Sequence, residues 1–382
     1  MMYLMFDKRF LSHLDRARRA FAFVLCLQLA PWSAIQRSNK STGNSRPKLA
    51  SKLWPEADQL FRSDPRWLGG DAAFSVDLGA GRVLWLFGDS FVARKAPASR
   101  EASIIVRNSV AIQTGYDRAH ATMKFYWRVT RDQLADFAPP EGKMWLWPAH
   151  GIRLGNRLLL FYSRVAPEDK KDSLGFKLVG WTAFLIDNPD QEPSAWTLRK
   201  LDVPESYGKI IIGASAMQIE DFLYLFGVSE PEHDVYLVRW PISRAAKGQL
   251  LSPEWWCGSD GWKSNISERR PVMRNGSSEF SIQRDPGGNG FIEVNTQGFG
   301  AADIVMRRAQ ILQGPWSTPQ KLYRPPESDG PNPFVYAGKS HPELTGSDLI
   351  VTYVANGSDQ TLANDMSIYY PRFVRLSLTY PN

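Results

Sequence analysis

The chain has 382 residues, and its 43% hydrophobic content is enough for a sizeable core in one large domain or two ordinary ones. The net charge of +7 is modest and gathers near the N-terminus, with no basic stripe among aromatic residues further on, which argues against a nucleic-acid partner. The two cysteines, Cys26 and Cys257, and the five histidines lack metal-ligand spacing, so we expect no metal and no cofactor.

The N-terminal segment has the pattern of an export signal. Basic residues precede the apolar run Ala20–Ala34, and small residues close it. This run is shorter than the ~20 residues that span a bilayer comfortably. We expect residues 1–34 to be a signal peptide, cleaved after Ala30 or Ala34, or an uncleaved membrane anchor. A misassigned start codon or an amphipathic first helix would explain the same pattern.

The remaining domain organisation follows from composition. Residues 35–53 are rich in Ser, Asn, Lys, Gly and Pro and predict a linker, and residues 54–382 predict the folded domain. If the export signal operates, the protein is secreted, periplasmic or associated with the cell envelope, and it touches a membrane only through its N-terminal segment.

The stretch Trp67–Val92 predicts a β-hairpin with a carboxylate at each open end. Two apolar strands flank an Ala-Gly turn, with Asp71 just before the first strand and Asp89 just after the second. Because the ends of antiparallel strands lie side by side, the two aspartates should be close together. Neighbouring glycines such as Gly88 allow tight turns and close approach. An Asp beside Gly at a strand end is also ordinary turn chemistry.

A weak repeat of two apolar strands and a turn occurs five times along the chain. Its second strands align at intervals of roughly 60–75 residues, a period typical of arrays and propellers. The aligned residues are Phe87, Phe161, Phe226, Val294 and Tyr353. The only plausible helix is short, near Thr130–Phe137. The predicted fold is therefore all-β, a five-bladed β-propeller, with a pair of β-sandwiches as the alternative.

In a propeller, residues at the starts of the blades converge on one mouth. The residues at those positions are Asp71, His150, Ser215, Glu279, His341 and Glu343. Several buried ionisable groups around one channel are costly without a role, although each one alone is as readily a hydrogen-bonded structural residue. A cation such as calcium could bind carboxylates there, but the sequence has no contiguous calcium loop.

The run Gly69–Val92, followed by the segment RNSVAIQ, resembles the domain-of-unknown-function 4185 family (DUF4185). The segments WPAHGIRL, GPWSTPQKLY, SHPEL and YYPRFVRL extend the resemblance over most of Trp67–Leu378. That family is a five-bladed propeller, and some members cleave D-arabinan, the arabinofuranose polymer of mycobacterial cell walls. The resemblance implies that Asp71 and Asp89 carry catalysis, because they match the two aspartates of the family's first blade.

Together these patterns predict a glycoside hydrolase that cleaves a furanoside-containing, D-arabinan-like polysaccharide by carboxylate acid/base catalysis. Asp71 is favoured as base and Asp89 as acid, although the sequence leaves the two roles exchangeable. Glu279 is a reserve acid, because an acidic residue at a blade start recurs in propeller furanosidases.

The expected partner is a polysaccharide or oligosaccharide, and the expected oligomeric state is a monomer. Aromatic rings and hydrogen-bonding side chains would bind the sugar. The candidates are Trp67, Asn108, Trp147, His150, Ser215, His341 and Glu343. The alternative function is a non-catalytic carbohydrate-binding or scaffold propeller, which would bind glycans and never cleave them.

Overall fold

The computed structural model describes residues 48–379, apart from residues 97, 119, 170–174, 205–208, 289, 299, 345 and 347. The predicted export segment, residues 1–34, lies outside the described residues and stays a prediction. In the part of the chain that is described, no helix has the length and apolar character needed to cross a membrane. Strands joined by short turns make up most of it, which confirms the all-β prediction.

Five sheets of at least four strands contain most of the strands of the described residues, and neighbouring strands within each sheet pair antiparallel. The first sheet contains β3 (Phe74–Gly79), β4 (Arg82–Phe87), β7 (Ser109–Thr114) and β8 (Thr122–Tyr126). The second contains β11 (Trp145–Leu154), β12 (Arg157–Pro167), β13 (Phe176–Ile186) and β14 (Arg199–Lys200). The third contains β15 (Ile210–Ile219), β16 (Phe222–Ser229), β17 (Val235–Pro241), β18 (Glu254–Trp256), β19 (Trp262–Lys263) and β20 (Pro271–Met273).

The fourth and fifth sheets complete the arrangement. The fourth contains β21 (Phe280–Arg284), β22 (Phe291–Gln297), β23 (Asp303–Ala309) and β24 (Gln320–Tyr323). The fifth contains β25 (Val335–Ser340), β26 (Leu349–Ala355), β27 (Arg372–Thr379) and β1 (Lys48–Leu53). A smaller sheet contains β2 (Trp67–Gly70), β5 (Ser90–Val92) and β6 (Ile104–Val106).

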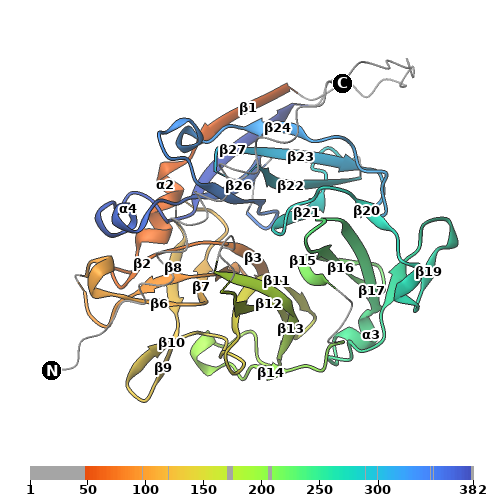
Figure 1. The fold of residues 1–382 in the computed structure, drawn as a ribbon, viewed down its shortest axis with the longest axis horizontal. Coiled ribbons are helices and arrows are strands. Elements are labelled where there is room, and N and C mark those ends of the chain that lie inside the picture. The colour runs from red at the N-terminus through yellow and green to blue at the C-terminus, as the bar shows by residue number, and fades with distance from the viewer. Residues whose placement is uncertain are drawn as a thin grey trace.

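The sheets are arranged around a common centre (Figure 1). Their first strands β3, β11, β15, β21 and β25 contact one another in that order. The Lys339 ammonium of β25 lies 4.2 Å from the centre of the Phe74 ring of β3, so the ring of first strands returns to its start. The five aligned residues of the sequence repeat all lie in the second strands, β4, β12, β16, β22 and β26. The repeat thus marks equivalent strands of the five sheets.

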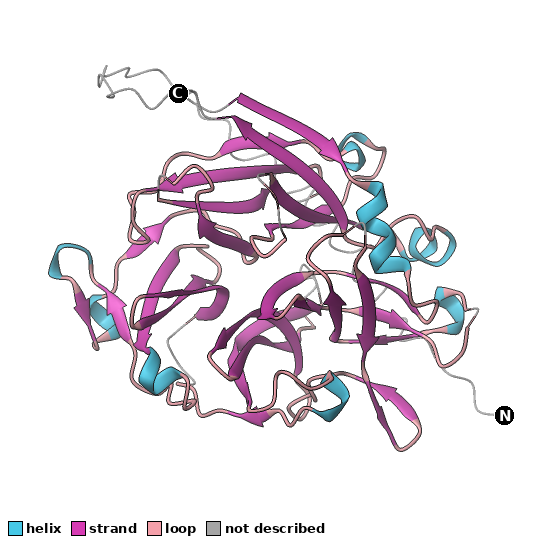
Figure 2. Cartoon of the chain, turned by 180° about the vertical axis from the view of Figure 1, so that it is seen from behind, coloured by secondary structure: helices cyan, strands magenta, loops and turns pink. Residues whose placement is uncertain are grey.

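Helices are short and lie at the periphery (Figure 2). The α-helices are α2 (Pro55–Asp58), α3 (Ile242–Ala245) and α4 (Asp359–Asn364). The 3₁₀ turns are η1 (Gln59–Arg62), η2 (Arg100–Ala102), η3 (Pro193–Ala195), η4 (Gly258–Asp260), η5 (Ile266–Glu268) and η6 (Pro326–Asp329).

The helix predicted near Thr130–Phe137 is wrong. This segment is part of a hairpin of β9 (Arg128–Thr130) and β10 (Gln133–Ala135). Arg131 and Asp132 between the strands have φ of 48° and 59°. Two successive residues with positive φ form a hairpin turn whose twist matches that of the flanking strands, and this conformation excludes a helix.

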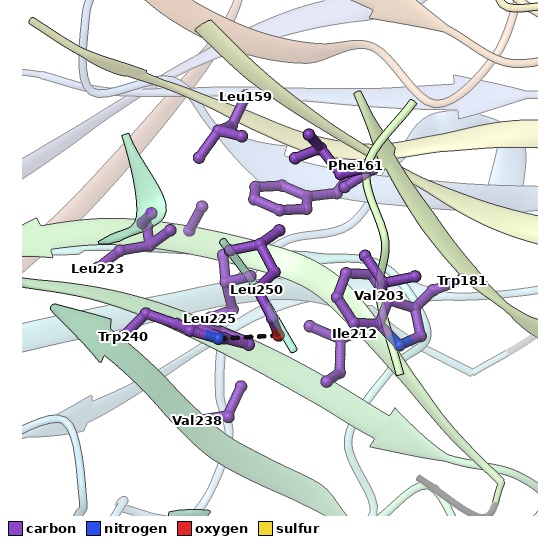
Figure 3. Close-up of a cluster of buried hydrophobic side chains, with 14 of the residues drawn as sticks. Leu159, Phe161, Trp181, Val203, Ile212, Leu223, Leu225, Val238, Trp240 and Leu250 are labelled. Atoms are coloured by element: carbon purple, nitrogen blue, oxygen red, sulfur yellow. Dashed lines mark hydrogen bonds between the residues drawn. The ribbon is translucent and has the colours of Figure 1, made fainter. Parts of the chain in front are cut away.

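Apolar side chains fill the space between adjacent sheets, as the cluster between the second and third shows (Figure 3). Phe161 and Trp181 project from one side, and Leu225 and Trp240 from the other. The buried Trp240 indole N–H donates to the carbonyl of Leu250 at 3.0 Å, so its polar atom is satisfied. Burial of each large apolar side chain contributes roughly 1.5–3 kcal/mol, which fixes the sheets against one another.

The fifth sheet combines strands from both ends of the described chain. β1 pairs with β27 along its whole length, from Lys48 opposite Thr379 to Leu53 opposite Val374. Residues 35–53 were predicted to be a linker, but the last six of them form this strand. Residues 35–47 lie outside the described residues.

Candidate functional site

The first hairpin brings the two predicted aspartates together. β3 and β4 are joined by a two-residue turn in which Ala80 and Gly81 have φ of 52° and 77°. The pairing continues past the strands, because the N–H of Gly88 donates to the carbonyl of Asp71 at 3.1 Å. Asp89 therefore lies next to Asp71, as the sequence predicts. A Cβ atom on Gly88 would lie 2.4 Å from Asp71 Oδ1, so only glycine leaves room for this carboxylate.

The two aspartates line a cavity of about 310 Å³. Glu279 lines the same cavity and comes from the loop before the fourth sheet. Trp147 and Phe176, both from the second sheet, contribute aromatic walls with ring centres 4.6 Å apart. Three carboxylates and an aromatic wall from separate sheets thus meet in one cavity, which can hold a polar ligand with apolar faces.

Asp71 is held by two tyrosines of the fifth sheet and the loop that follows β26. The Tyr336 hydroxyl donates to Asp71 Oδ2 at 2.8 Å and itself accepts from the amide of Asn356 at 3.2 Å. The one proton of the Tyr369 hydroxyl is shared between Asp71 Oδ2, at 3.3 Å, and the carbonyl of Asp89, at 3.1 Å. Burial, with the charges of Asp89 and Glu279, raises the pKa of Asp71 to about 8 although both tyrosines oppose the rise. The Asp71 carboxyl is therefore largely protonated at neutral pH.

Asp89 has a partner on each of its oxygens. The indole N–H of Trp147 donates to Oδ1 at 2.9 Å, and Arg107 donates to Oδ2 at 3.1 Å. Burial raises the pKa of Asp89, and the Arg107 guanidinium opposes that rise. With a cation and an N–H donor on its two oxygens, Asp89 is arranged as a fixed negative charge beside Asp71.

Glu279 forms an ion pair with Lys339 at 2.7 Å. The Glu279 side chain is 34% exposed, whereas that of Lys339 is 1% exposed. The Lys339 ammonium also donates to the carbonyls of Ala72 and Ala337, at 2.5 and 3.1 Å. These three acceptors fix Lys339, and its ion pair holds Glu279 in place at the cavity.

Trp67 and Asn108, predicted to bind sugar, are not among the residues that line this cavity. Trp67 is 1% exposed, stacks on Phe125 and donates its indole N–H to Ser109 at 3.1 Å. Asn108 is also 1% exposed, and its amide donates to the carbonyls of Ala138 and Leu146. These contacts indicate that Trp67 and Asn108 stabilise the interior of the fold.

His150, Ser215, His341 and Glu343 also fall outside the lining of the cavity. Burial lowers the pKa of His150 to about 4. The Ser215 hydroxyl accepts the N–H of Ile282, which links β15 to β21.

His341 and Glu343 lie deeper among the first strands. His341 is 2% exposed, and its ring nitrogens lie 2.6 Å from Ser75 Oγ and 2.7 Å from Thr352 Oγ1. Burial raises the pKa of Glu343 to about 7.

Irregular backbone explains why these blade-start residues miss the cavity. The register of β11 gains one residue between Pro148 and Gly151, which reverses the faces of the strand, whereas that of β15 gains two between Ile212 and Ser215, which interrupts the pairing without reversing it. Ala149 and Ala214 lie within these irregularities and line the cavity in place of His150 and Ser215. Of the predicted site residues, the structure brings only Asp71, Asp89, Glu279 and Trp147 together there.

Four residues that contact the carboxylates were missed from the sequence: Arg107, Tyr336, Lys339 and Tyr369. Tyr369 has a positive φ of 62°, which no sequence pattern announces. Arg107 precedes Asn108 in the segment RNSVAIQ, and that position was the one available signal. Among the described residues, no cluster of three or more His, Cys, Asp or Glu side chains is arranged to hold a metal ion.

A family model described as "Domain of unknown function (DUF5005)" matches residues 56–378. The resemblance to DUF4185 is therefore wrong, because the matching family is a different one. The segments that carried the resemblance to DUF4185 consist largely of strand and turn patterns, which propeller-like proteins share widely. No curated protein matches the chain significantly.

Several solved structures are similar to this chain to different degrees. A protein from Bacteroides ovatus, whose description as a hydrolase is provisional, is 18% identical with a TM-score of 0.69, over 86% of this chain and 90% of that one. An α-L-arabinofuranosidase from Podospora anserina in complex with cellotriose is 11% identical with a TM-score of 0.46, over 82% and 92%. An exo-β-1,3-galactanase from Phanerochaete chrysosporium with β-1,3-galactotriose is 11% identical with a TM-score of 0.47, over 80% and 60%. At 18% identity, the likeness to the Bacteroides ovatus protein concerns the fold alone.

Proposed function

Because the chain belongs to the DUF5005 family, whose description assigns no activity, we propose from the cavity itself that the protein is a glycoside hydrolase. The observation that carries the proposal is the meeting of Asp71, Asp89 and Glu279 in one cavity, with Asp71 protonated and Glu279 ion-paired. Glycoside cleavage needs one carboxyl group that donates a proton and one carboxylate that activates water or attacks the sugar.

The environments of the carboxyl groups divide these roles. Asp71 holds its proton at neutral pH, and its Oδ2 already accepts the Tyr336 hydroxyl, so the proton resides on Oδ1. Asp71 then donates this proton to the leaving oxygen. Glu279, ion-paired with Lys339, acts as the base or nucleophile. This assignment reverses the sequence-based preference for Asp71 as base. Asp89 contributes the fixed charge that keeps the proton on Asp71.

The substrate that suits this cavity is a polysaccharide. Trp147 and Phe176 offer apolar faces to a sugar ring, while the carboxylates and the Ser163 hydroxyl offer hydrogen bonds. A furanoside such as D-arabinan is the finer candidate. We further propose that the five sheets are the five blades of a propeller with this cavity at its mouth. The apolar segment within residues 1–34 would place the enzyme outside the cytoplasm, where such glycans occur.

The test is release of reducing sugar ends by the purified full chain from D-arabinan, L-arabinan, xylan and galactan. We expect cleavage of one polymer, and a loss of roughly 10²–10⁴ in rate for Asp71→Asn and for Glu279→Gln. Asp77→Asn is the matched control, because Asp77 is an exposed aspartate of the same hairpin outside the cavity. Binding of a glycan by a folded protein that cleaves none would instead support the carbohydrate-binding alternative.

The two roles can be separated with aryl glycosides of the same sugar. A nitrophenolate leaves without a proton, so such a substrate should restore most of the rate to Asp71→Asn and none to Glu279→Gln. If the aryl glycoside restored the rate of Glu279→Gln alone, Glu279 would be the proton donor and Asp71 the base or nucleophile.

A further inference from the structure

A second cavity adjoins the first. It has a volume of about 800 Å³ and extends over loops and strand ends of the third and fourth sheets. Phe176, Leu178, Glu230 and Ser278 line both cavities. The two cavities therefore lie side by side, and the three carboxylates Asp71, Asp89 and Glu279 line only the first.

The second cavity contains buried polar atoms that lack partners. Asn295 is 3% exposed and Arg307 is 7% exposed, and both line it. Among the described residues, neither Asn295 Oδ1 nor Arg307 Nε has a hydrogen-bond partner. The other guanidinium nitrogens of Arg307 donate to the carbonyls of Arg274 and Asn275, at 3.1 and 3.0 Å, so the side chain is fixed in place.

The strand register puts the two unsatisfied groups on one face of the fourth sheet. Arg307 of β23 lies opposite Glu293 of β22, and Asn295 follows two residues later on the same strand. Residues two apart on a strand point to the same face. The acceptor side chain of Asn295 and the donor side chain of Arg307 therefore lie on the same face of the fourth sheet.

An unsatisfied buried acceptor and donor are unfavourable unless a ligand completes them. A hydroxyl group suits both, since it can donate to Asn295 Oδ1 and accept from Arg307 Nε. The charges of the lining balance, because two cations, Lys177 and Arg307, stand against two carboxylates, Glu168 and Glu230. The chemistry therefore favours an uncharged ligand rich in hydroxyl groups.

We propose that the second cavity is a subsite for a neutral sugar chain, which binds the units that lie beyond those held in the first cavity. This inference rests on the proposed glycosidase function, because the ligand of the second cavity is the part of the sugar chain that extends beyond the first cavity. The preferred substrate is then an oligosaccharide or polymer long enough to occupy both cavities, and short glycosides are poor ligands.

The test measures how affinity depends on chain length. Arabino-, xylo- and galacto-oligosaccharides from dimers to hexamers are titrated by calorimetry into the full chain carrying Asp71→Asn, so that no ligand is cleaved. We expect Kd to fall by roughly tenfold or more from dimer to hexamer in one series. Gln297→Trp, at an exposed residue that lines the second cavity, should remove this gain by filling the space.

The matched control is Gln133→Trp. Gln133 is an exposed glutamine at a strand end that lines neither cavity, so its variant should keep the length-dependent gain. An unchanged unfolding midpoint for both variants excludes misfolding as the cause.

Hexamers that bind no better than dimers, a Gln297→Trp variant that keeps the gain, or no binding in any series would each overturn the subsite. Cleavage by the wild-type chain is scored separately. Cleavage without length dependence contradicts only the subsite, and length-dependent binding without cleavage contradicts only the hydrolase.

Discussion

Replacement of Tyr336 by Phe tests whether the tyrosine pair controls the protonation of Asp71. The Tyr336 hydroxyl donates to Asp71 Oδ2 at 2.8 Å and therefore favours the ionised carboxylate. Its removal should raise the pKa of Asp71 further. A hydrogen bond to a charged group is worth about 1.5–3 kcal/mol, and one pKa unit corresponds to about 1.4 kcal/mol. The pKa of Asp71 should thus move from about 8 to roughly 9–10.

The measurement is an NMR titration of the full chain labelled with carboxyl-¹³C aspartate. The Asp71 resonance is identified by its absence from Asp71→Asn. Because Asp71 and Asp89 interact, the apparent midpoint belongs partly to the pair, and the main step of the Asp71 resonance is the one to compare. In an active enzyme, the alkaline limb of kcat/KM should move upward with that midpoint, since a proton donor works only while protonated.

Tyr353→Phe is the matched control for this titration. Tyr353 is a buried tyrosine that also donates to a carboxylate, Glu327 at 2.9 Å, and it is not among the cavity residues. Its loss should leave the Asp71 midpoint in place. A midpoint in Tyr336→Phe that stays constant or moves to lower pH would refute the claim that the Tyr336 hydroxyl favours the ionised form of Asp71.

Three further predictions concern other buried polar groups. Lys339→Met removes the cation beside Glu279 and should lower kcat/KM on the cleaved glycan by roughly 10²–10³. It should also lower the unfolding midpoint, because the carbonyls of Ala72 and Ala337 and the Glu279 carboxylate lose their donor; unchanged activity in the folded variant would contradict the role of Lys339. Burial raises the pKa of Glu293 to about 8, so its stabilising contribution is full below the unfolded pKa and is lost as pH rises towards 8. Glu293→Gln should reduce the fall of unfolding free energy with pH by up to about 1.4 kcal/mol per unit in urea titrations, and an identical slope in both proteins would count against it. Asn108→Ala should destabilise the fold by roughly 2–4 kcal/mol in the same assay, because buried carbonyls lose their donors; normal stability with impaired glycan binding would restore the sugar-binding interpretation.

The sequence predicted what depends on local pattern. Strand alternation and the Ala80–Gly81 turn place Asp71 beside Asp89, because register follows from the hairpin itself. The repeat identified equivalent second strands, because buried strands carry long apolar runs that stand out. The first inference needed only residues that are close in the sequence, and the second needed only the spacing of the repeat.

What the sequence missed depends on irregular backbone and on contacts between distant segments. The bulge in β11 and the two-residue irregularity in β15 place Ala149 and Ala214, instead of His150 and Ser215, at the cavity, and no residue type predicts an irregularity at those positions. The Tyr336 and Tyr369 hydroxyls reach Asp71 across more than half of the chain. Such partners become visible only when the sheets are assembled.

The pairing of β1 with β27 affects how the protein can be produced. The family match begins at residue 56, after β1 has ended at Leu53. A fragment trimmed to that boundary would leave β27 as an unprotected edge, with a row of free N–H and C=O groups that other chains can extend. Such a fragment is at risk of intermolecular strand addition and aggregation even though every cavity residue is present. Recombinant fragments should therefore begin no later than Lys48.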